Sequence, residues 1–138
     1  LIGAVLEGYP SGVFHYHPKA HALEFLWGTP PTFSMSEVIR SANVALAPLL
    51  IVFTSVWNRS SIKYGDLAYS HGLIAAGHMA ENVLLVATSL SMATRPIAGF
   101  DDHVISELLD LDTQVEQPIY SLLLCPSAGK SEGEIVPE

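Results

Sequence analysis

One stretch of the chain, residues 66–90, limits most strongly what this sequence can fold into. It carries only two charged side chains, Asp66 and Glu81, and no proline. At 1.5 Å of rise per residue, such a segment can form a single helix about 37 Å long. Because the segment is apolar on every side, we expect the helix to be buried at the centre of the fold.

Small residues recur every four positions along this segment, at Ala68, Gly72, Ala76 and Ala80. This spacing places them on one ridge of the helix, where a second helix could approach closely. Two interpretations follow from the ridge. It can pack against another part of the same subunit, or it can form the contact between two subunits.

The composition is sufficient for one globular domain. Of the 138 residues, 49% are hydrophobic, which is enough for a substantial core. We assign residues 1–126 to the domain and 127–138, which are small and polar, to a tail. The net charge of −8, with only six lysines and arginines, argues against a surface that follows the phosphates of DNA or RNA.

The location of the protein is inferred from weak signals. The longest uncharged stretch, 41–58, contains Pro48, and its strongly apolar part is shorter than the roughly 20 residues that span a bilayer, so we expect no membrane segment. Cys125 is the only cysteine, which excludes an internal disulfide and fits a reducing compartment. The apolar start has no basic region before it and no initiator methionine. We expect a cytoplasmic protein whose chain is a fragment, a processed product or one piece of a longer polypeptide.

Strands and helices alternate along the rest of the chain. We expect strands over 1–6 and 48–56, the second interior and covered on both faces, and a hairpin from 13–17 and 22–26. Ser34 or Ser36 could cap a helix through about Val44.

In the C-terminal third, residues 92–97 lead from the long helix into Ala98-Gly99-Phe100. A helix capped by Asp101 and a last strand over 119–125, after Pro118, are expected to follow. Gly99 would permit backbone conformations that other residues avoid. The capped helix would bury one face, formed by Val104, Ile105, Leu108 and Leu109.

The histidines do not form a metal-binding pattern. His15 and His17 share one face of a strand, whereas His71 and His78 lie seven positions apart on a helix, too far to share an ion. We expect no metal site. His78 is better interpreted as a hydrogen-bonded core histidine, and Asn82 needs a polar partner if it is buried.

Four motifs in one order resemble the C-terminal half of a flavoprotein of the nitroreductase superfamily, and most closely the SagB-type dehydrogenases. These oxidise thiazolines and oxazolines to thiazoles and oxazoles in modified peptides. The matching residues are Arg59 with Lys63-Tyr64-Gly65, then Ala76-Gly77-His78 with Asn82, then Pro96-Ile97-Ala98-Gly99-Phe100-Asp101, and the paired segments 12–17 and 21–24.

The resemblance implies an α+β, nitroreductase-like fold with a largely antiparallel sheet packed around a long central helix. It also implies FMN as cofactor and an intertwined homodimer, formed through the long helix, with the flavin at the subunit interface. The first third of such proteins supplies an arginine-bearing helix that holds the FMN phosphate. Since the chain has no counterpart of it, we expect a missing N-terminal segment or a partner chain.

The resemblance also assigns roles to six residues. Lys63 and Tyr64 would be the acid and base, and Pro96, Ile97, Ala98 and Gly99 would contact the flavin ring, with backbone N–H groups directed at N5 and O4. Without the resemblance, Lys63 and Tyr64 would be an exposed lysine and a packing tyrosine. Residues 96–99 would then be a turn before a helix.

Three functions remain open. The first is oxidation of an azoline in a peptide, or of a related small-molecule substrate, with oxygen reoxidising the flavin. The second is an NAD(P)H-dependent nitro or quinone reductase, which would not need the lysine–tyrosine pair. The third is a non-catalytic domain that serves dimerisation or docking.

Overall fold

A computed structural model describes residues 2–3, 8–39 and 49–125. The elements in chain order are β1 (Ile2–Gly3), β2 (Gly12–His17), β3 (Ala22–Gly28), α1 (Met35–Val38), β4 (Leu49–Val56), α2 (Trp57–Tyr64), the 3₁₀ turn η2 (Gly65–Leu67), α3 (Ala68–Ser89), β5 (Ala93–Ile97), α4 (Asp102–Leu108) and β6 (Glu116–Cys125). The predicted tail at 127–138 lies outside the described residues.

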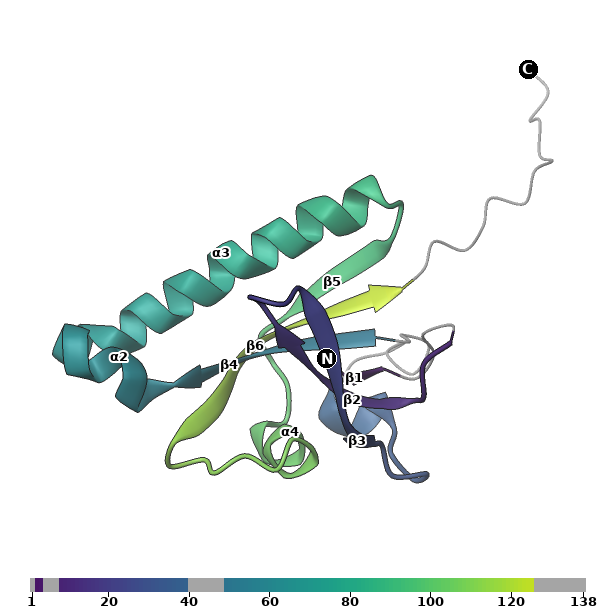
Figure 1. The fold of residues 1–138 in the computed structure, drawn as a ribbon, viewed down its shortest axis with the longest axis horizontal. Helices are drawn as coiled ribbons and strands as arrows, with labels where there is room; N and C mark the ends of the chain where they lie inside the picture. The colour runs from purple at the N-terminus through teal and green to yellow at the C-terminus, as the bar shows by residue number, and fades with distance from the viewer. Residues whose placement is uncertain (1, 4–7, 40–48, 126–138) are drawn as a thin grey trace, which may run out of the picture.

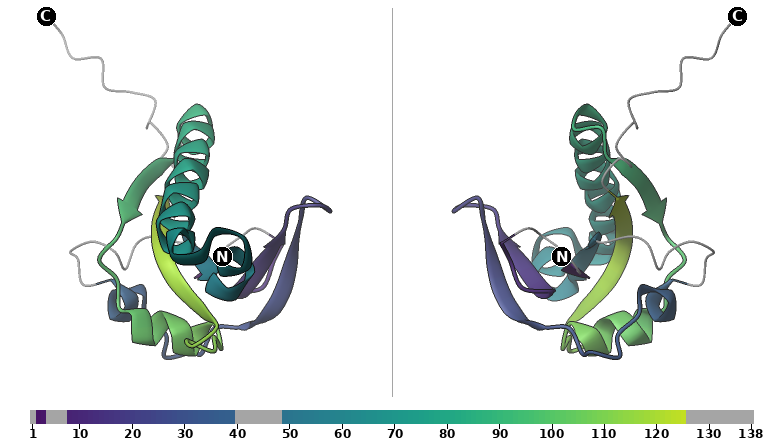
Figure 2. Two further views of the ribbon diagram at one scale, coloured as in Figure 1. Left: turned by 90° about the vertical axis from the view of Figure 1, so that its left-hand side faces the viewer. Right: turned by 90° about the vertical axis from the view of Figure 1, so that its right-hand side faces the viewer.

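The strands form one six-stranded sheet in the order β3-β2-β1-β4-β6-β5, and neighbouring strands are antiparallel. The sheet curves so that β5 and the β2–β3 hairpin rise on either side of α3 (Figures 1 and 2). The predicted α+β architecture, with an antiparallel sheet beside a long helix, is confirmed.

Alternate side chains of β6 face two separate layers of the core, as the two-residue period of a strand requires. Leu122 and Leu124 cluster with Ala80 and Ala87 of α3. Leu123, between them, belongs to the core on the opposite face, where α1 and α4 cover the sheet. Its buried members are Ile2, Val13, Met35, Val38, Ile39, Leu50, Ile97, Ile105 and Leu123.

The long helix is confirmed as α3, but the prediction that it is buried on every side is wrong. Only small residues are buried on it, because one face lies on the sheet and nothing in the described chain covers the other. Its exposed large apolar side chains are Tyr69, Leu73, Ile74, Met79, Leu85 and Val86.

The ridge of small residues packs within this chain, so its interpretation as a contact between subunits is also wrong. Ala76 and Ala80 are buried, and Ala80 packs against β6. A Cβ at Gly72 would lie 2.9 Å from Cζ3 of Trp57, the first residue of α2. The ridge therefore brings α3 close to the sheet and to α2, and a partner would meet the large side chains.

Several helices and strands in the structure differ from the prediction in their bounds or their burial. The helix after Ser34 ends at Val38 because Ile39 adopts extended backbone; residues 40–48 lie outside the described ones. Strand β4 is interior to the sheet, yet only Leu50 in it is fully buried. Strand β6 starts at Glu116 and contains Pro118, which lies opposite Thr54 where the register with β4 shifts, a position that tolerates proline.

The predicted hairpin and first strand are confirmed where the chain is described. The hairpin forms as β2 and β3, and Ile2–Gly3 is the described part of the first strand. Within the described ranges, no helix combines the length and the apolar character that crossing a bilayer requires.

Asp101 caps α4 as predicted, because its side chain accepts hydrogen bonds from the backbone N–H groups of His103 and Val104. Replacing Asp101 by alanine should lower the free energy of unfolding by about 1 kcal/mol, the usual cost of a lost N-cap. Urea unfolding measures this loss. Asp101→Ser keeps an acceptor and should lose much less; equal losses in the two variants would show that the cap is not the cause.

Candidate functional site

The loop after β5 is positioned by the pairing of this edge strand with β6. Pro96 and Ile97 pair with Leu122 and Ser121 of β6, and the Ser121 hydroxyl donates a hydrogen bond of 3.1 Å to the Ile97 carbonyl. Ile97 is buried, whereas Ala98 and Gly99, which follow it, are exposed. The strand is therefore held firmly up to the residue before the loop, and the loop itself is accessible.

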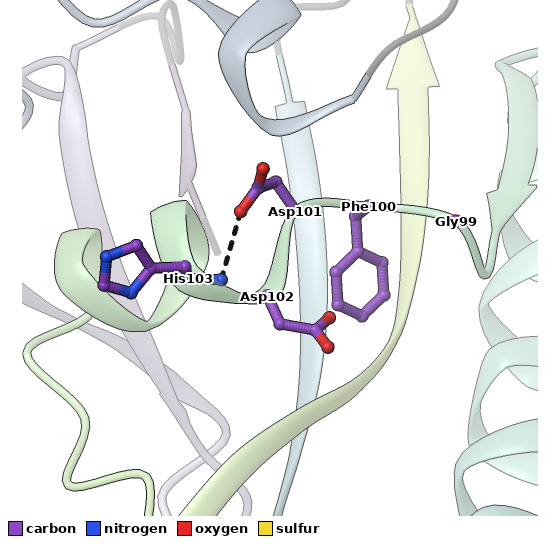
Figure 3. Close-up of a pocket in the computed structure, with 5 residues that line it drawn as sticks. All are labelled: Gly99, Phe100, Asp101, Asp102 and His103. Atoms are coloured by element: carbon purple, nitrogen blue, oxygen red, sulfur yellow. Dashed lines mark hydrogen bonds between the residues drawn. The ribbon is translucent and has the colours of Figure 1, made fainter.

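Gly99 has open space around it. A Cβ placed there would meet no atom within 4 Å, and the residue lines a pocket of about 440 Å³ together with Phe100, Asp101, Asp102 and His103 (Figure 3). The positive-φ glycines in the described chain are Gly8 and Gly65, so Gly99 does not use the conformational freedom that a glycine permits there. Gly99 leaves room for a ligand rather than making a tight turn.

The loop suits the ring of a flavin better than its phosphate. In the described chain, neither the Ala98 nor the Gly99 N–H is among the backbone donors that hydrogen-bond to another residue, so both can donate to a ligand. The pocket beside Gly99 is lined by Asp101 and Asp102 and by no lysine or arginine. The loop therefore fits a planar ring with acceptor atoms, but its surroundings do not attract a phosphate.

Lys63 and Tyr64 lie in the last turn of α2, against the start of α3. The Lys63 Nζ is 4.9 Å from the centroid of the Tyr64 ring, within the range of a cation–π contact. The imidazole of His71 meets the same ring edge-on, with centroids 4.7 Å apart and planes at 81°. Tyr64 remains 41% exposed, and its ring is contacted on two sides, by the Lys63 ammonium and the His71 imidazole.

The contact with His71 escapes sequence reasoning because it depends on the turn between α2 and α3. Gly65 has φ +54° and ends α2, so the chain changes direction before α3 begins. In a single continuous helix, the side chains of residues 64 and 71 would lie differently relative to each other. A glycine after Tyr64 is a typical signal for the end of a helix, but it does not give the angle between α2 and α3.

The two groups of predicted site residues lie on different sides of α3. Ala98 lines a cavity of about 320 Å³ with Ala76 and Ala80 on the inward face of the helix. His71, which contacts Tyr64, precedes Ala80 by nine residues, two and a half helical turns, and so lies on the opposite face. One copy of the described chain therefore does not bring the Lys63–Tyr64 pair and the 96–99 loop together.

The other polar residues that the sequence singled out are more exposed than expected. His78 and Asn82 are exposed on α3, so the prediction of a core histidine is wrong. His15 contacts Glu24 at 3.2 Å across the hairpin, and His21 bonds to Tyr16 at 2.9 Å. No cluster of three or more possible metal ligands occurs among the described residues.

A groove that the sequence did not predict lies between α3, β4 and the hairpin. It measures about 790 Å³, and its walls include Phe14 and Tyr16 from β2, Phe53 from β4, and Met79 and Val83 from α3. Neither the Lys63–Tyr64 pair nor residues 96–99 line it. The groove forms because the sheet curves, a property that residue patterns do not give.

Comparison with known proteins identifies the broader family that the motifs resemble, without distinguishing the subgroup. The model of the Nitroreductase family matches residues 6–125. A Methanocaldococcus jannaschii protein assigned as a nitroreductase is 29% identical over 126 residues, covering 91% of this chain. The microcin B17-processing protein McbC of Escherichia coli is 26% identical over 118 residues, covering 82% of this chain.

The fold has a matching solved structure. A crystal structure from Anabaena variabilis, assigned as a nitroreductase, superposes with a TM-score of 0.80 at 26% identity, and the match covers 91% of this chain and 26% of the Anabaena chain. The two sequence relatives are also longer: the matches span 61% of the Methanocaldococcus protein and 43% of McbC.

Proposed function

This chain belongs to the nitroreductase family, and on that premise we propose that it is an FMN-dependent oxidoreductase that dehydrogenates azoline rings in a modified peptide. The electrons would pass to molecular oxygen. The observation that carries the proposal is the association of Lys63 with Tyr64, an ammonium 4.9 Å from the ring centre of a tyrosine that is 41% exposed.

Azoline oxidation requires a base as well as a hydride acceptor. One ring carbon loses a hydride, and the neighbouring atom loses a proton to a group within about 3 Å. The Tyr64 oxygen can receive that proton in its deprotonated form, with the Lys63 ammonium nearby as the counter-charge. Reduction of a nitro group or a quinone by NAD(P)H has no such deprotonation of the substrate, so the pair would be unnecessary for it.

The loop residues fit the remaining part of the reaction. When bound, FMN supplies the hydride acceptor at its N5 atom. Ala98 and Gly99 present two N–H groups that lack partners in the described chain, and these can stabilise negative charge on the reduced ring. Gly99 also leaves the approach to those groups open, since a Cβ there would point into empty space.

The two relatives favour different substrates. McbC is named for the processing of the peptide microcin B17, which supports a peptide substrate here. The Methanocaldococcus protein is assigned as a nitroreductase, which favours the NAD(P)H-dependent reaction as the second candidate. Because both identities are below 30%, the substrate has to be decided by experiment.

We also infer that the protein acts as a homodimer. The outward face of α3 exposes Ile74, Leu85 and Val86, each more than half accessible. A contiguous surface of such side chains on a protein usually marks an interface. The homodimer would therefore bury the large residues of α3 rather than its small ones.

Absorption spectroscopy of the purified protein, before and after reconstitution with FMN, is the first test. Oxidised flavin bands that bleach when an azoline-containing peptide is added without oxygen, and return with air, are the expected result. Bleaching by NAD(P)H alone, with no response to the peptide, would replace the proposal by a nitro or quinone reductase. A protein that stays colourless after reconstitution would leave the non-catalytic function.

A further inference from the structure

Helix α2 carries the Lys63–Tyr64 pair but has little of its own to hold it in place. It lies at one end of α3 (Figure 1), and among the described residues none in α2 is buried. Its N-cap residue, Val56, makes no side-chain hydrogen bond that would cap the helix. A helix of 8 residues is not stable on its own in water. Contacts with other elements must therefore hold α2 where the pair can act.

Trp57, the first residue of α2, links the helix to the sheet. Its indole Nε1 donates a hydrogen bond of 3.1 Å to the Oε1 of Gln117 in β6. Gln117 is itself fixed, because its Nε2 donates a hydrogen bond of 2.9 Å to the Thr113 carbonyl and its backbone pairs with Ser55 of β4. The hydrogen bond therefore sets the orientation of the indole relative to the sheet.

The same indole packs against α3, at the place where that helix has no side chain. The rings of Trp57 and Tyr69 have centroids 5.2 Å apart and planes at 36°. A Cβ at Gly72 would lie 2.9 Å from Cζ3 of Trp57 and 3.3 Å from the Ser55 Oγ. Gly72 therefore provides the room that lets the indole lie against α3.

We propose that Trp57 is a positioning residue: by joining α2 to β6 and to α3, it holds Lys63 and Tyr64 where they act on the substrate. The inference rests on the proposed function for the reaction that the pair serves. Tyr64 follows Trp57 by seven residues, about 10 Å along the helix. Since the Tyr64 ring meets His71 at 4.7 Å, α2 contacts α3 at both of its ends. A shift of α2 at Trp57 therefore changes the position of the pair.

Gly72→Ala tests this role without changing the pair. The added methyl should displace the indole, and the rate of azoline oxidation at saturating peptide should fall about 10- to 100-fold, the usual cost of a displacement of about 1 Å in a site. The affinity for FMN should not change, because the flavin ring is assigned to the loop after β5. Ser70→Ala is the matched control: it also places an alanine beside His71, but Ser70 is exposed, so the wild-type rate should remain.

Trp57→Phe shows whether the indole is the group that Gly72→Ala disturbs. Phenylalanine has neither the Nε1 donor nor the outer ring that carries Cζ3, so this variant alone should lose rate over the same range. Adding Gly72→Ala to Trp57→Phe should cost nothing more, because the new methyl then meets no Cζ3. Such non-additivity is expected of two residues in contact.

Nuclear Overhauser effects between the Tyr64 ring and the His71 imidazole measure the geometry without using activity. The wild-type protein should show them, since the ring centroids are 4.7 Å apart. They should weaken in Gly72→Ala and in Trp57→Phe and stay unchanged in Ser70→Ala. Circular dichroism of the same samples should show that the helices are retained.

Three results would overturn the proposal. These are a Gly72→Ala variant that keeps both the wild-type rate and the Overhauser effects, losses that multiply in the double variant, and an affinity for FMN that falls together with the rate. Failure of the proposed function looks different: the wild-type protein would not oxidise an azoline, yet Gly72→Ala would still weaken the Overhauser effects. Trp57 would then position the pair for another reaction.

Discussion

Replacing Lys63 by methionine or Tyr64 by phenylalanine is expected to lower the rate of azoline oxidation by about 10²- to 10⁴-fold, the usual contribution of a positioned acid or base. Lys63→Met removes the ammonium group and keeps a side chain of similar length. Tyr64→Phe removes the hydroxyl and keeps the ring. In the wild-type protein the Lys63 Nζ lies against the Tyr64 ring. Since both variants only remove a polar group, neither should form a polar contact that the wild-type protein lacks. Flavin binding should not change, because the ring is assigned to the loop after β5.

Single-turnover measurement of flavin reduction by the peptide separates this effect from slow product release. Ser61→Ala is the matched control, since Ser61 is exposed on the same helix and its hydroxyl bonds only to the Asn58 carbonyl. The control should keep the wild-type rate. If nitro reduction by NAD(P)H falls as strongly as azoline oxidation in the two variants, the pair does not act as the base.

The contact between His71 and Tyr64 determines how the Tyr64→Phe variant can be interpreted. Its imidazole packs against the Tyr64 ring and not against a group in the 96–99 loop, so it serves as a positioning residue. Tyr64→Phe keeps this ring contact. The loss in that variant can therefore be assigned to the missing hydroxyl rather than to a displaced ring.

Sequence patterns were sufficient to locate α3 and α4 in the chain, but not to predict which of the side chains on α3 are exposed. The proline-free run with only two charged residues predicted α3, and the side-chain oxygen of Asp101 predicted the start of α4; both are local properties of the chain. The same run was expected to be buried on all sides, yet Leu85 and Val86 are exposed. Hydrophobicity shows that a surface needs covering, but it does not show whether the same chain covers it.

The relation between the site residues depended on the fold in a way that motifs cannot give. Lys63-Tyr64 and Pro96–Gly99 are recognisable as separate motifs, and motif order says nothing about which face of α3 each one meets. That relation comes from Gly65, which redirects the chain, and from Ala76 and Ala80, whose burial fixes the inward face. Gly65 and Ala76 belong to the motifs themselves, and Ala80 to the ridge of small residues, but the sequence does not show how they set the geometry of the site.

Leu122→Ala should produce the largest loss of stability, about 3 to 4 kcal/mol, as expected for a fully buried leucine in a packed core. Leu122 is 0% exposed and lies between Ile51 of β4 and Pro96 of β5. Its side chain belongs to the cluster that joins the sheet to Ala80 and Ala87 of α3, so its loss removes contacts between the two layers. Typical domains unfold at 5–15 kcal/mol, so this loss would be a large fraction of the total.

Urea unfolding followed by circular dichroism measures this change, with Leu26→Ala as the control. The control makes the same chemical change on the edge strand β3, where Leu26 is 44% exposed, and should cost about 1 kcal/mol or less. Because Leu122 also lies opposite Pro96, the variant should bind flavin more weakly before it unfolds. Equal losses in the two leucine variants would mean that α3 is not held on the sheet by the Leu122 side chain.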